Sequence, residues 1–228
     1  MNKNDILTTE DNIVNFIFDA IFSKQLQPGA KLSESVVAKE LGTSRDVIRK
    51  AFSKLVTMGI LTYKKNQGFN VVWLSEENTK DIFEARKVIE IGVMEILTKK
   101  YSTQQIDLSA LSENINHEEY LKISLRNGEY VKTSCDFHLT LALLSGNDFL
   151  INALKPLIPL STLAGLLYDN KEATFCSYNE HRVIIDAIKE CDTKKAQITM
   201  AEHLDNCVIA LNFVSDDIKK NKFSFFQV

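Results

Sequence analysis

Three observations predict a mainly α-helical protein of two domains. Only 8 of the 228 residues are glycine and 3 are proline, which argues against a turn-rich all-β protein. Leu, Ile, Ala, Lys and Glu, which favour helices, recur in long stretches. The length and the 45% hydrophobic content suffice for the cores of two small domains. We place the boundary after residue 74, giving domains over 1–74 and 75–228.

The two domains differ in charge, although the whole chain carries a net charge of only −3. Residues 1–74 hold 10 Lys and Arg against 7 Asp and Glu, whereas residues 75–228 hold 17 against 23. The N-terminal domain is therefore the basic one. Such an asymmetry suits a nucleic-acid-binding module joined to an acidic partner domain.

The N-terminal domain begins with three predicted helices. Apolar residues at helical spacing predict a first helix that begins at Thr9 and ends before Pro28. A second covers 34–41 and ends at Gly42, a residue type that helix C-termini favour, and a third follows at once over 44–57. Two helices joined by a tight turn with glycine, the second basic on its outer face, form a helix-turn-helix.

The third helix is the predicted recognition helix. Thr43 and Asp46 form its expected capping box. Arg45 and Arg49 lie four residues apart and hence on one face, with Lys50 beside them, so their guanidinium groups can reach guanine edges or phosphates. For each basic residue alone, a solvated surface position is the alternative.

A predicted β-hairpin follows the recognition helix. The β-prone segments 60–63 and 69–73 flank a tip that contains Lys65 and Gly68. A helix-turn-helix followed by a hairpin is a winged helix-turn-helix, and the hairpin is its wing. A flexible Gly68 lets the tip backbone approach the minor groove or a phosphate.

Three stretches between Pro28 and Leu61 form a specific series. They read P-G-A-K-L-S-E, V-A-K-E-L-G-T-S-R-D-V-I-R-K-A-F-S-K-L and G-I-L. The series resembles the DNA-binding domain of the GntR family, whose pattern is close to P-G-x-x-L-S-E, L-A-x-x-L-G-V-S-R-x-P-V-R-x-A-L-x-x-L and G-L. Asp46 and Val47 replace a small residue and a proline, and Lys50 stands where Glu is frequent. We expect these departures to affect operator preference.

The resemblance implies which residues contact DNA. Arg45 and Arg49 are the expected main contacts to bases or phosphates, and Gly68 is the expected wing contact. Serines at helix starts are expected phosphate donors. The full expected set is Ser33, Ser44, Arg45, Arg49, Lys50, Lys65 and Gly68.

From residue 75 onward the sequence predicts only helices, six or seven of them, in an antiparallel bundle. Separate helices are expected near 104–115 and 117–127, and one near 148–167. The stretch 149–168 is nearly as apolar as a membrane span, but it contains Asn, Lys and two prolines. We therefore expect a buried core helix and no membrane association.

Four well-separated cysteines occur in the C-terminal domain. Without a C-x-x-C pair they argue against a disulfide framework or a thiolate zinc site, so reduced thiols and a cytoplasmic location are expected. The first residues contain no apolar stretch typical of a secretory signal. The cysteines are Cys135, Cys176, Cys191 and Cys207.

Three of the four histidines, His138, His181 and His203, lie on predicted apolar helices. Imidazoles from three helices that meet inside a bundle could bind a first-row divalent metal and leave positions open for water or a carboxylate. By spacing alone, however, each is more typical of a surface or hydrogen-bonded core histidine.

The segments around these histidines read D-F-H-L-T-L-A-L-L-S-G-N, E-H-R-V-I-I-D-A-I and A-Q-I-T-M-A-E-H-L. They resemble the FCD effector domain of one large branch of GntR regulators (the FadR-type C-terminal domain), and R-K-V-I-E at 86–90 resembles its first helix. The resemblance implies that His138, His181 and His203 bind a divalent metal, with zinc, nickel and manganese as candidates. Arg86 is either a carboxylate partner for an effector or the salt-bridge partner of Glu90.

One family ligand is missing. The family has an Asp four residues before the first metal-binding histidine, and here that position is Ser134. Asp136 lies only two residues from His138, so it points elsewhere on the helix. Two alternatives remain open. The histidines hold a metal whose shell water or effector completes, or they bind an anionic effector directly, with Arg86 and Ser134 as expected effector contacts.

The expected function is a homodimeric transcription regulator, more often a repressor in this family, and not an enzyme. Two recognition helices would bind a near-palindromic double-stranded DNA operator, and a small carboxylate or sugar acid in the helical domain would alter the affinity. A ligand-independent DNA-binding dimer with a degenerate pocket is one alternative. A metal-dependent hydrolase is another, which the lack of an obvious general base disfavours.

Overall fold

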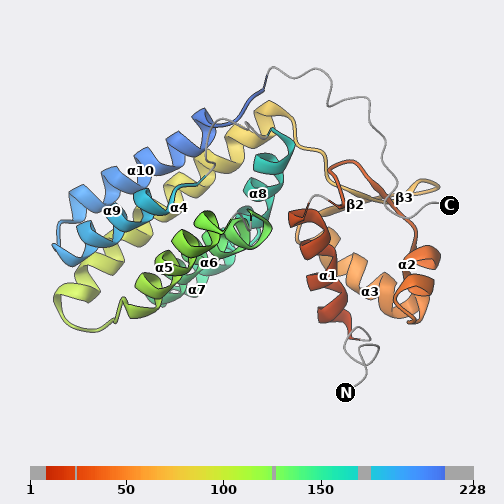
Figure 1. The fold of residues 1–228 in the computed structure, drawn as a ribbon, viewed down its shortest axis with the longest axis horizontal. Helices are drawn as coiled ribbons and strands as arrows, with labels where there is room; N and C mark the ends of the chain where they lie inside the picture. The colour runs from red at the N-terminus through yellow and green to blue at the C-terminus, as the bar shows by residue number, and fades with distance from the viewer. Residues whose placement is uncertain (1–8, 24, 125–126, 169–175, 214–228) are drawn as a thin grey trace. The chain divides into compact units, whose positions relative to one another are not determined.

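The computed structural model describes residues 9–23, 25–124, 127–168 and 176–213. Contacts divide the chain into two compact units, one comprising Met1–Leu74 and the other Ser75–Val214. Each unit has its own buried hydrophobic residues. Figure 1 shows the helices and strands of both units.

The N-terminal unit packs three helices against a small antiparallel sheet of order β1-β3-β2. The helices are α1 (Glu10–Phe22), α2 (Glu34–Glu40) and α3 (Arg45–Thr57), and the strands are β1 (Lys31–Leu32), β2 (Leu61–Lys64) and β3 (Gly68–Val71). Phe52 of α3 packs edge-on against Phe69 of β3, with ring centroids 5.0 Å apart. The predicted winged helix-turn-helix is confirmed, and β1 adds a third strand to the predicted hairpin.

The turn between α2 and α3 follows the predicted design at Gly42, whose φ of 63° lies in the left-handed region that glycine favours. The predicted cap of α3 is wrong by one residue. Ser44, not Thr43, is the N-cap, and its Oγ accepts a hydrogen bond from the amide of Val47. The helix begins directly after this serine, which leaves Thr43 in the turn.

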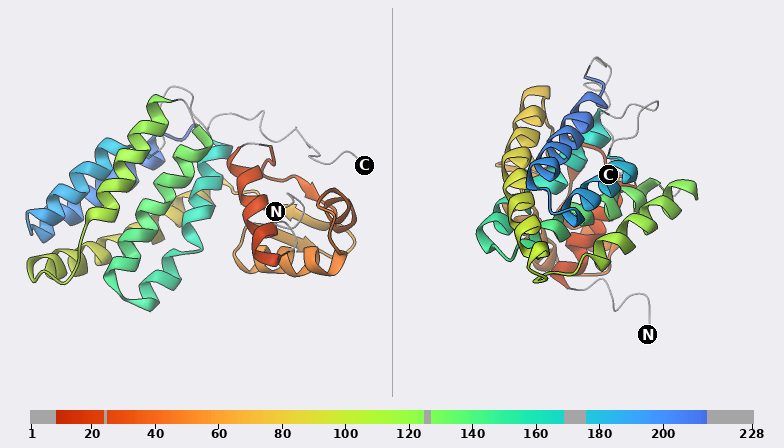
Figure 2. Two further views of the ribbon diagram at one scale, coloured as in Figure 1. Left: turned by 60° about the horizontal axis from the view of Figure 1, so that its bottom comes forward. Right: turned by 90° about the vertical axis from the view of Figure 1, so that its left-hand side faces the viewer.

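The C-terminal unit is a bundle of seven helices among the described residues. They are α4 (Glu76–Ser102), α5 (Ser109–Ile123), α6 (Asn127–Ser145), α7 (Asp148–Leu154), α8 (Leu157–Leu167), α9 (Tyr178–Lys189) and α10 (Thr193–Ile209). The long helix α4 packs lengthwise against α10, α5 packs against α6, and α9 contacts both α10 and α5 (Figure 2). The predicted all-α bundle is confirmed.

Two helix predictions in this unit are wrong. The helices expected at 104–115 and 117–127 are the single helix α5, because Leu111, Ile115 and Leu121 form one continuous buried face. A positive φ at Gln104 places the residues before Ser109 in a turn instead of a helix.

The helix expected at 148–167 is also two helices. Pro156 lacks an amide hydrogen and divides the stretch into α7 and α8. The stretch Asp148–Leu167 is long and apolar enough to cross a membrane by composition, which is weak evidence by itself. At 7 and 11 residues, each helix is shorter than the roughly 20 residues of a membrane span, and most of α8 is buried in the bundle.

Candidate nucleic-acid interface and metal centre

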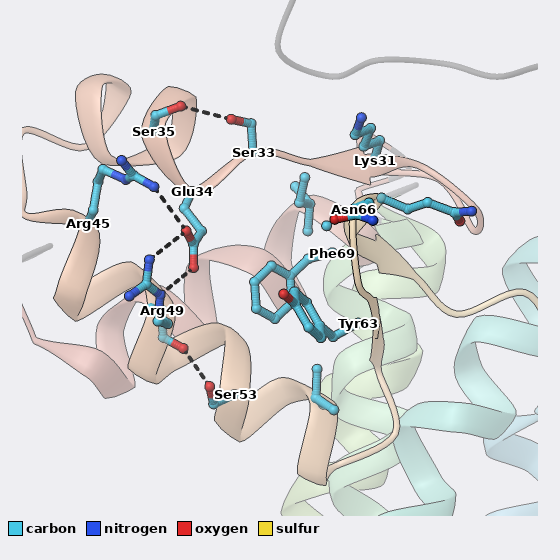
Figure 3. Close-up of a pocket in the computed structure, with 14 residues that line it drawn as sticks. Lys31, Ser33, Glu34, Ser35, Arg45, Arg49, Ser53, Tyr63, Asn66 and Phe69 are labelled. Carbon is cyan, nitrogen blue, oxygen red and sulfur yellow. Dashed lines mark hydrogen bonds and ion pairs between the residues drawn. The ribbon is translucent and has the colours of Figure 1, made fainter.

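An open groove of about 730 Å³ lies between the recognition helix α3, the start of α2 and the wing. Figure 3 shows Arg45 and Arg49 pointing from α3 toward Glu34 on α2. Arg49 donates from Nε to Glu34 Oε1 at 2.8 Å and from Nη2 to Oε2 at 3.2 Å, and Arg45 Nη2 lies 3.4 Å from Oε2. The side chains of the arginines stay 55% and 62% exposed, so both remain available to DNA.

Glu34 was not anticipated as part of this site. Its hydrogen bonds from Arg49 and then Arg45 outweigh partial burial and lower its pKa, which keeps the carboxylate ionised. In the sequence, Glu34 stood out only as the glutamate of the L-S-E motif. Its role as an anchor depends on the packing of α2 beside α3, which the sequence does not specify by spacing.

The remaining predicted DNA contacts divide between the groove and its surroundings. Ser33 and Gly68 line the groove with Tyr63, a residue not predicted to belong to the site. Ser44 is engaged as the N-cap of α3. Lys50 and Lys65 are exposed outside the groove lining. Gly68 has a φ of 82°, which only glycine adopts easily at this turn of the wing.

In the C-terminal unit, three helices bring the three predicted histidines together. His138 comes from α6, His181 from α9 and His203 from α10, and each is at most 2% exposed. The Nε2 atoms of His138 and His203 are 3.3 Å apart. The three histidines therefore meet in the folded protein, which their spacing in the sequence could not establish.

A fourth group, the thiol of Cys176, lies in the same cluster. Its Sγ is 3.6 Å from His138 Nε2, 3.2 Å from His181 Nε2 and 3.5 Å from His203 Nε2. All four candidate ligand atoms lie within 4.8 Å of one another. The cysteine spacing argument missed this group, because a single thiol can join histidines that lie far away along the chain.

Each histidine is oriented by a carboxylate on its other ring nitrogen. Nδ1 of His138 contacts Glu90 at 2.5 Å, Nδ1 of His181 contacts Glu118 at 3.0 Å, and Nδ1 of His203 contacts Glu180 at 2.7 Å. A carboxylate that accepts the Nδ1 proton leaves Nε2 as the electron-pair donor, the arrangement typical of metal-binding histidines. Sequence reasoning named Glu90 only as a possible partner of Arg86, and it did not identify Glu118 or Glu180.

Burial and neighbouring charges perturb the cluster strongly. Burial lowers the pKa of His138 to about 3 despite the opposing effect of Glu90. Burial raises the pKa of Glu118 to about 8. For His203, Cys176 and Glu180 outweigh burial and raise the pKa to about 9. Strongly shifted ionisable groups in one buried cluster are typical of functional sites.

Arg86 lies beside this cluster and makes the predicted salt bridge. Its Nε donates to Glu90 Oε1 at 2.8 Å and its Nη1 donates to Ser161 Oγ at 2.8 Å. Its Nη2 is buried without a hydrogen-bond partner among the described residues. Arg86 also lines a cavity that offers about 10 Å³ to the centre of a water molecule, room for about one water.

Ser134, which stands where the family has its carboxylate ligand, contacts Cys176. Ser134 is buried, and its Oγ donates a hydrogen bond to Cys176 Sγ at 2.9 Å. Asp136, as predicted, points away from the cluster and is exposed. The thiol therefore stands next to the residue that replaces the family's carboxylate.

Comparisons with known proteins agree with both units. Residues 9–71 match the family described as "Bacterial regulatory proteins, gntR family", and residues 81–206 match the FCD domain. The chain belongs to the GntR family, FCD branch. It is therefore a DNA-binding transcriptional regulator of the GntR/FCD type, from a family of regulators and not of enzymes.

Individual relatives of this GntR regulator are distant. It is 28% identical to "HTH-type transcriptional regulator LutR" of Bacillus subtilis (strain 168), over 80% of this chain and 91% of the relative. It is 23% identical to "Probable D-xylose utilization operon transcriptional repressor" of Paenarthrobacter nicotinovorans, over 86% of each chain. A putative GntR regulator from Rhodococcus sp. RHA1 shares the fold, with a TM-score of 0.77 at 20% identity over 88% of this chain and 95% of that one.

Proposed function

We propose that this regulator is a homodimeric repressor whose operator affinity changes when a divalent metal binds to the histidine cluster. The observation that carries the proposal is the convergence of three buried imidazoles, each held at Nδ1 by a carboxylate. Burying polar groups is costly unless they are hydrogen-bonded, and a hydrogen bond from Nδ1 to a carboxylate is the arrangement that metal-binding histidines use. The presence of a repressor among the relatives supports the sign of regulation.

The DNA-binding part of the proposal rests on the groove lined by α3, the start of α2 and the wing. Arg45 and Arg49 are exposed on one face of the recognition helix and held by Glu34, so their guanidinium groups are oriented before DNA arrives. Ser33, Ser44, Lys50, Lys65 and the backbone at Gly68 complete the proposed contact set. In a dimer, two such helices would enter successive major grooves of a double-stranded operator.

The donor set fits a divalent metal. Imidazole nitrogens suit zinc and nickel, two of the three metals that the resemblance implies. A bound ion would link α6, α9 and α10, because one ligand comes from each helix. Such a link supplies a change in the packing of the bundle, which a DNA-binding dimer can transmit as altered spacing of its recognition helices.

A small organic acid is the second candidate ligand. The unpartnered Nη2 of Arg86 favours it, because a buried guanidinium nitrogen without an acceptor is costly and a carboxylate would satisfy it. The adjoining cavity has room for about one water, so it must enlarge before a carboxylate can enter.

The test is operator binding by metal-free and metal-loaded full-length protein. Random-sequence selection would supply the operator, and fluorescence anisotropy would give the affinity with and without zinc. We expect zinc to change the affinity of the wild type several-fold and to leave His181→Ala unchanged. Equal affinities for all these forms would contradict the proposal and favour a dimer that binds DNA without a ligand. Circular dichroism checks that the variant is folded.

A further inference from the structure

We infer that Cys176 is the fourth ligand of a closed metal site of three histidines and one cysteine, and that the protein responds to a thiophilic metal ion itself. The site is the metal site of the proposed function, on which this inference rests. An acid bound to an open coordination position is then not the signal, because the thiolate occupies that position.

The distances between the candidate ligand atoms support four-fold coordination. A tetrahedral zinc ion, with Zn–N of about 2.0–2.1 Å and Zn–S of about 2.3 Å, holds nitrogen pairs about 3.3 Å apart and nitrogen–sulfur pairs about 3.5 Å apart. The Nε2 atoms of His138 and His203 are 3.3 Å apart. The three nitrogen–sulfur pairs are 3.2, 3.5 and 3.6 Å apart. These four separations match a tetrahedral site, and all four ligand atoms lie within 4.8 Å of one another, so a bound ion would draw any wider pair together.

The surroundings of Cys176 hold its thiol toward the histidines. Cys176 has a φ of 63°, a conformation that L residues rarely adopt without outside support. The support comes from Tyr130, whose hydroxyl donates to the Cys176 carbonyl oxygen at 2.7 Å, and from Ser134, which donates to Sγ. Strained residues that neighbours hold in place are concentrated at functional sites.

Ser134 and Cys176 together account for the departure from the family pattern. A carboxylate at position 134 would lie beside the sulfur, where two anionic groups would repel each other. A serine there instead leaves space for the sulfur and gives it a hydrogen bond. The missing carboxylate ligand is therefore exchanged for a thiolate ligand from another part of the chain, and the site keeps four protein donors.

Four protein ligands change what the site can bind. A tetrahedral shell filled by protein is typical of closed zinc sites, whereas sites that bind further ligands keep a position open. A thiolate favours zinc and cobalt over manganese, which prefers oxygen donors. Coordination releases the thiol proton to solvent, since the thiolate is the ligand form.

Cobalt spectroscopy on the full-length protein tests the fourth ligand directly. Metal-free protein is titrated with Co²⁺, and we expect one ion per chain with a thiolate-to-cobalt charge-transfer band in the near ultraviolet. Cys176→Ala should lose the band and bind cobalt at least about 10-fold more weakly, since even an outer-shell change costs about 10–100-fold. The control is Cys191→Ala, because Cys191 is exposed and its thiol contacts the backbone of Lys189 instead of the cluster.

A second variant keeps the test valid if Cys176→Ala proves unstable. Ser134→Asp combined with Cys176→Ala restores the family's carboxylate, and it should bind cobalt without the charge-transfer band. Stoichiometric cobalt without the band in the wild type would overturn the inference and leave a three-histidine site. A band that persists in Cys176→Ala would also overturn it, by assigning the thiolate to another cysteine. A band together with operator affinity that does not change with metal would support Cys176 as a ligand, and it would contradict both the metal response and the proposed function.

Discussion

At the scale of single residues, both candidate sites use carboxylates to hold the groups that bind. Glu34 holds Arg49 and Arg45 on the DNA-binding face, and Glu180 holds His203 in the buried cluster. A group that is oriented in advance loses less conformational entropy when its ligand arrives. Removing the side chain that binds and removing the carboxylate that orients it should therefore lower the affinity by different amounts.

Arg49→Ala should weaken operator binding. The lost guanidinium contact is expected to cost about 1–3 kcal/mol if Arg49 reads a base. Arg182→Ala is the matched control, since Arg182 is likewise exposed and paired with a glutamate, Glu119, but lies on α9. Fluorescence anisotropy at fixed salt measures both. Equal affinities of the two variants would remove Arg49 from the contact set.

Glu180→Gln should weaken metal binding without removing a ligand. Its carboxylate orients the His203 ring at 2.7 Å, and loss of such a partner typically costs about 10–100-fold in metal affinity. Competition with a chromogenic chelator measures the change. Glu119→Gln, a change on the exposed surface of α5, should leave the affinity unaltered. An unchanged affinity in Glu180→Gln would contradict the role assigned to this carboxylate.

At the scale of elements, backbone conformation decides where each helix and strand ends. Gly68 begins β3 with a φ of 82°, whereas Gly92 lies inside α4 with an ordinary helical backbone. An added Cβ meets nothing within 4 Å at either position, so steric contact with neighbours plays no part. The two glycines therefore isolate the effect of backbone conformation on stability.

Gly68→Ala should lower the free energy of unfolding by about 1 kcal/mol, because an L residue is strained in the left-handed region. Gly92→Ala should raise it by about 0.5–1 kcal/mol, because alanine favours a helix. Urea denaturation followed by circular dichroism measures both. The same sign for the two substitutions would contradict this account.

At the scale of the whole molecule, ligand binding and stability are linked within the C-terminal unit. A metal that binds only the folded cluster stabilises that unit, by about 2.7 kcal/mol at a metal concentration 100 times the Kd. The N-terminal unit contains none of the cluster residues, so metal should act on one part of the unfolding profile only.

Differential scanning calorimetry with zinc and then with excess chelator measures this linkage. Zinc should raise the unfolding temperature of the C-terminal unit, and chelator should reverse the shift. Loss of the shift in His181→Ala would tie it to the cluster. A zinc-induced shift of the same size in that variant would assign the stabilisation to binding elsewhere.

The sequence by itself determined the fold class, the helix-turn-helix, the wing and the three histidines. These features are encoded locally, in apolar spacing, in glycine at a turn and in motifs around His138, His181 and His203. The cap at Ser44 and the division of 148–167 at Pro156 depend on local geometry that spacing predicted less well.

Only the tertiary structure decided which distant groups meet. Glu34 reaches Arg49 because α2 packs beside α3, and Cys176 reaches three histidines because α6, α9 and α10 converge. A single cysteine and scattered glutamates carry no periodic signal, so their role comes from contacts between residues as many as 63 positions apart, as between Glu118 and His181. Packing of the apolar helix faces brings these polar groups together, and that packing is a property of the whole chain.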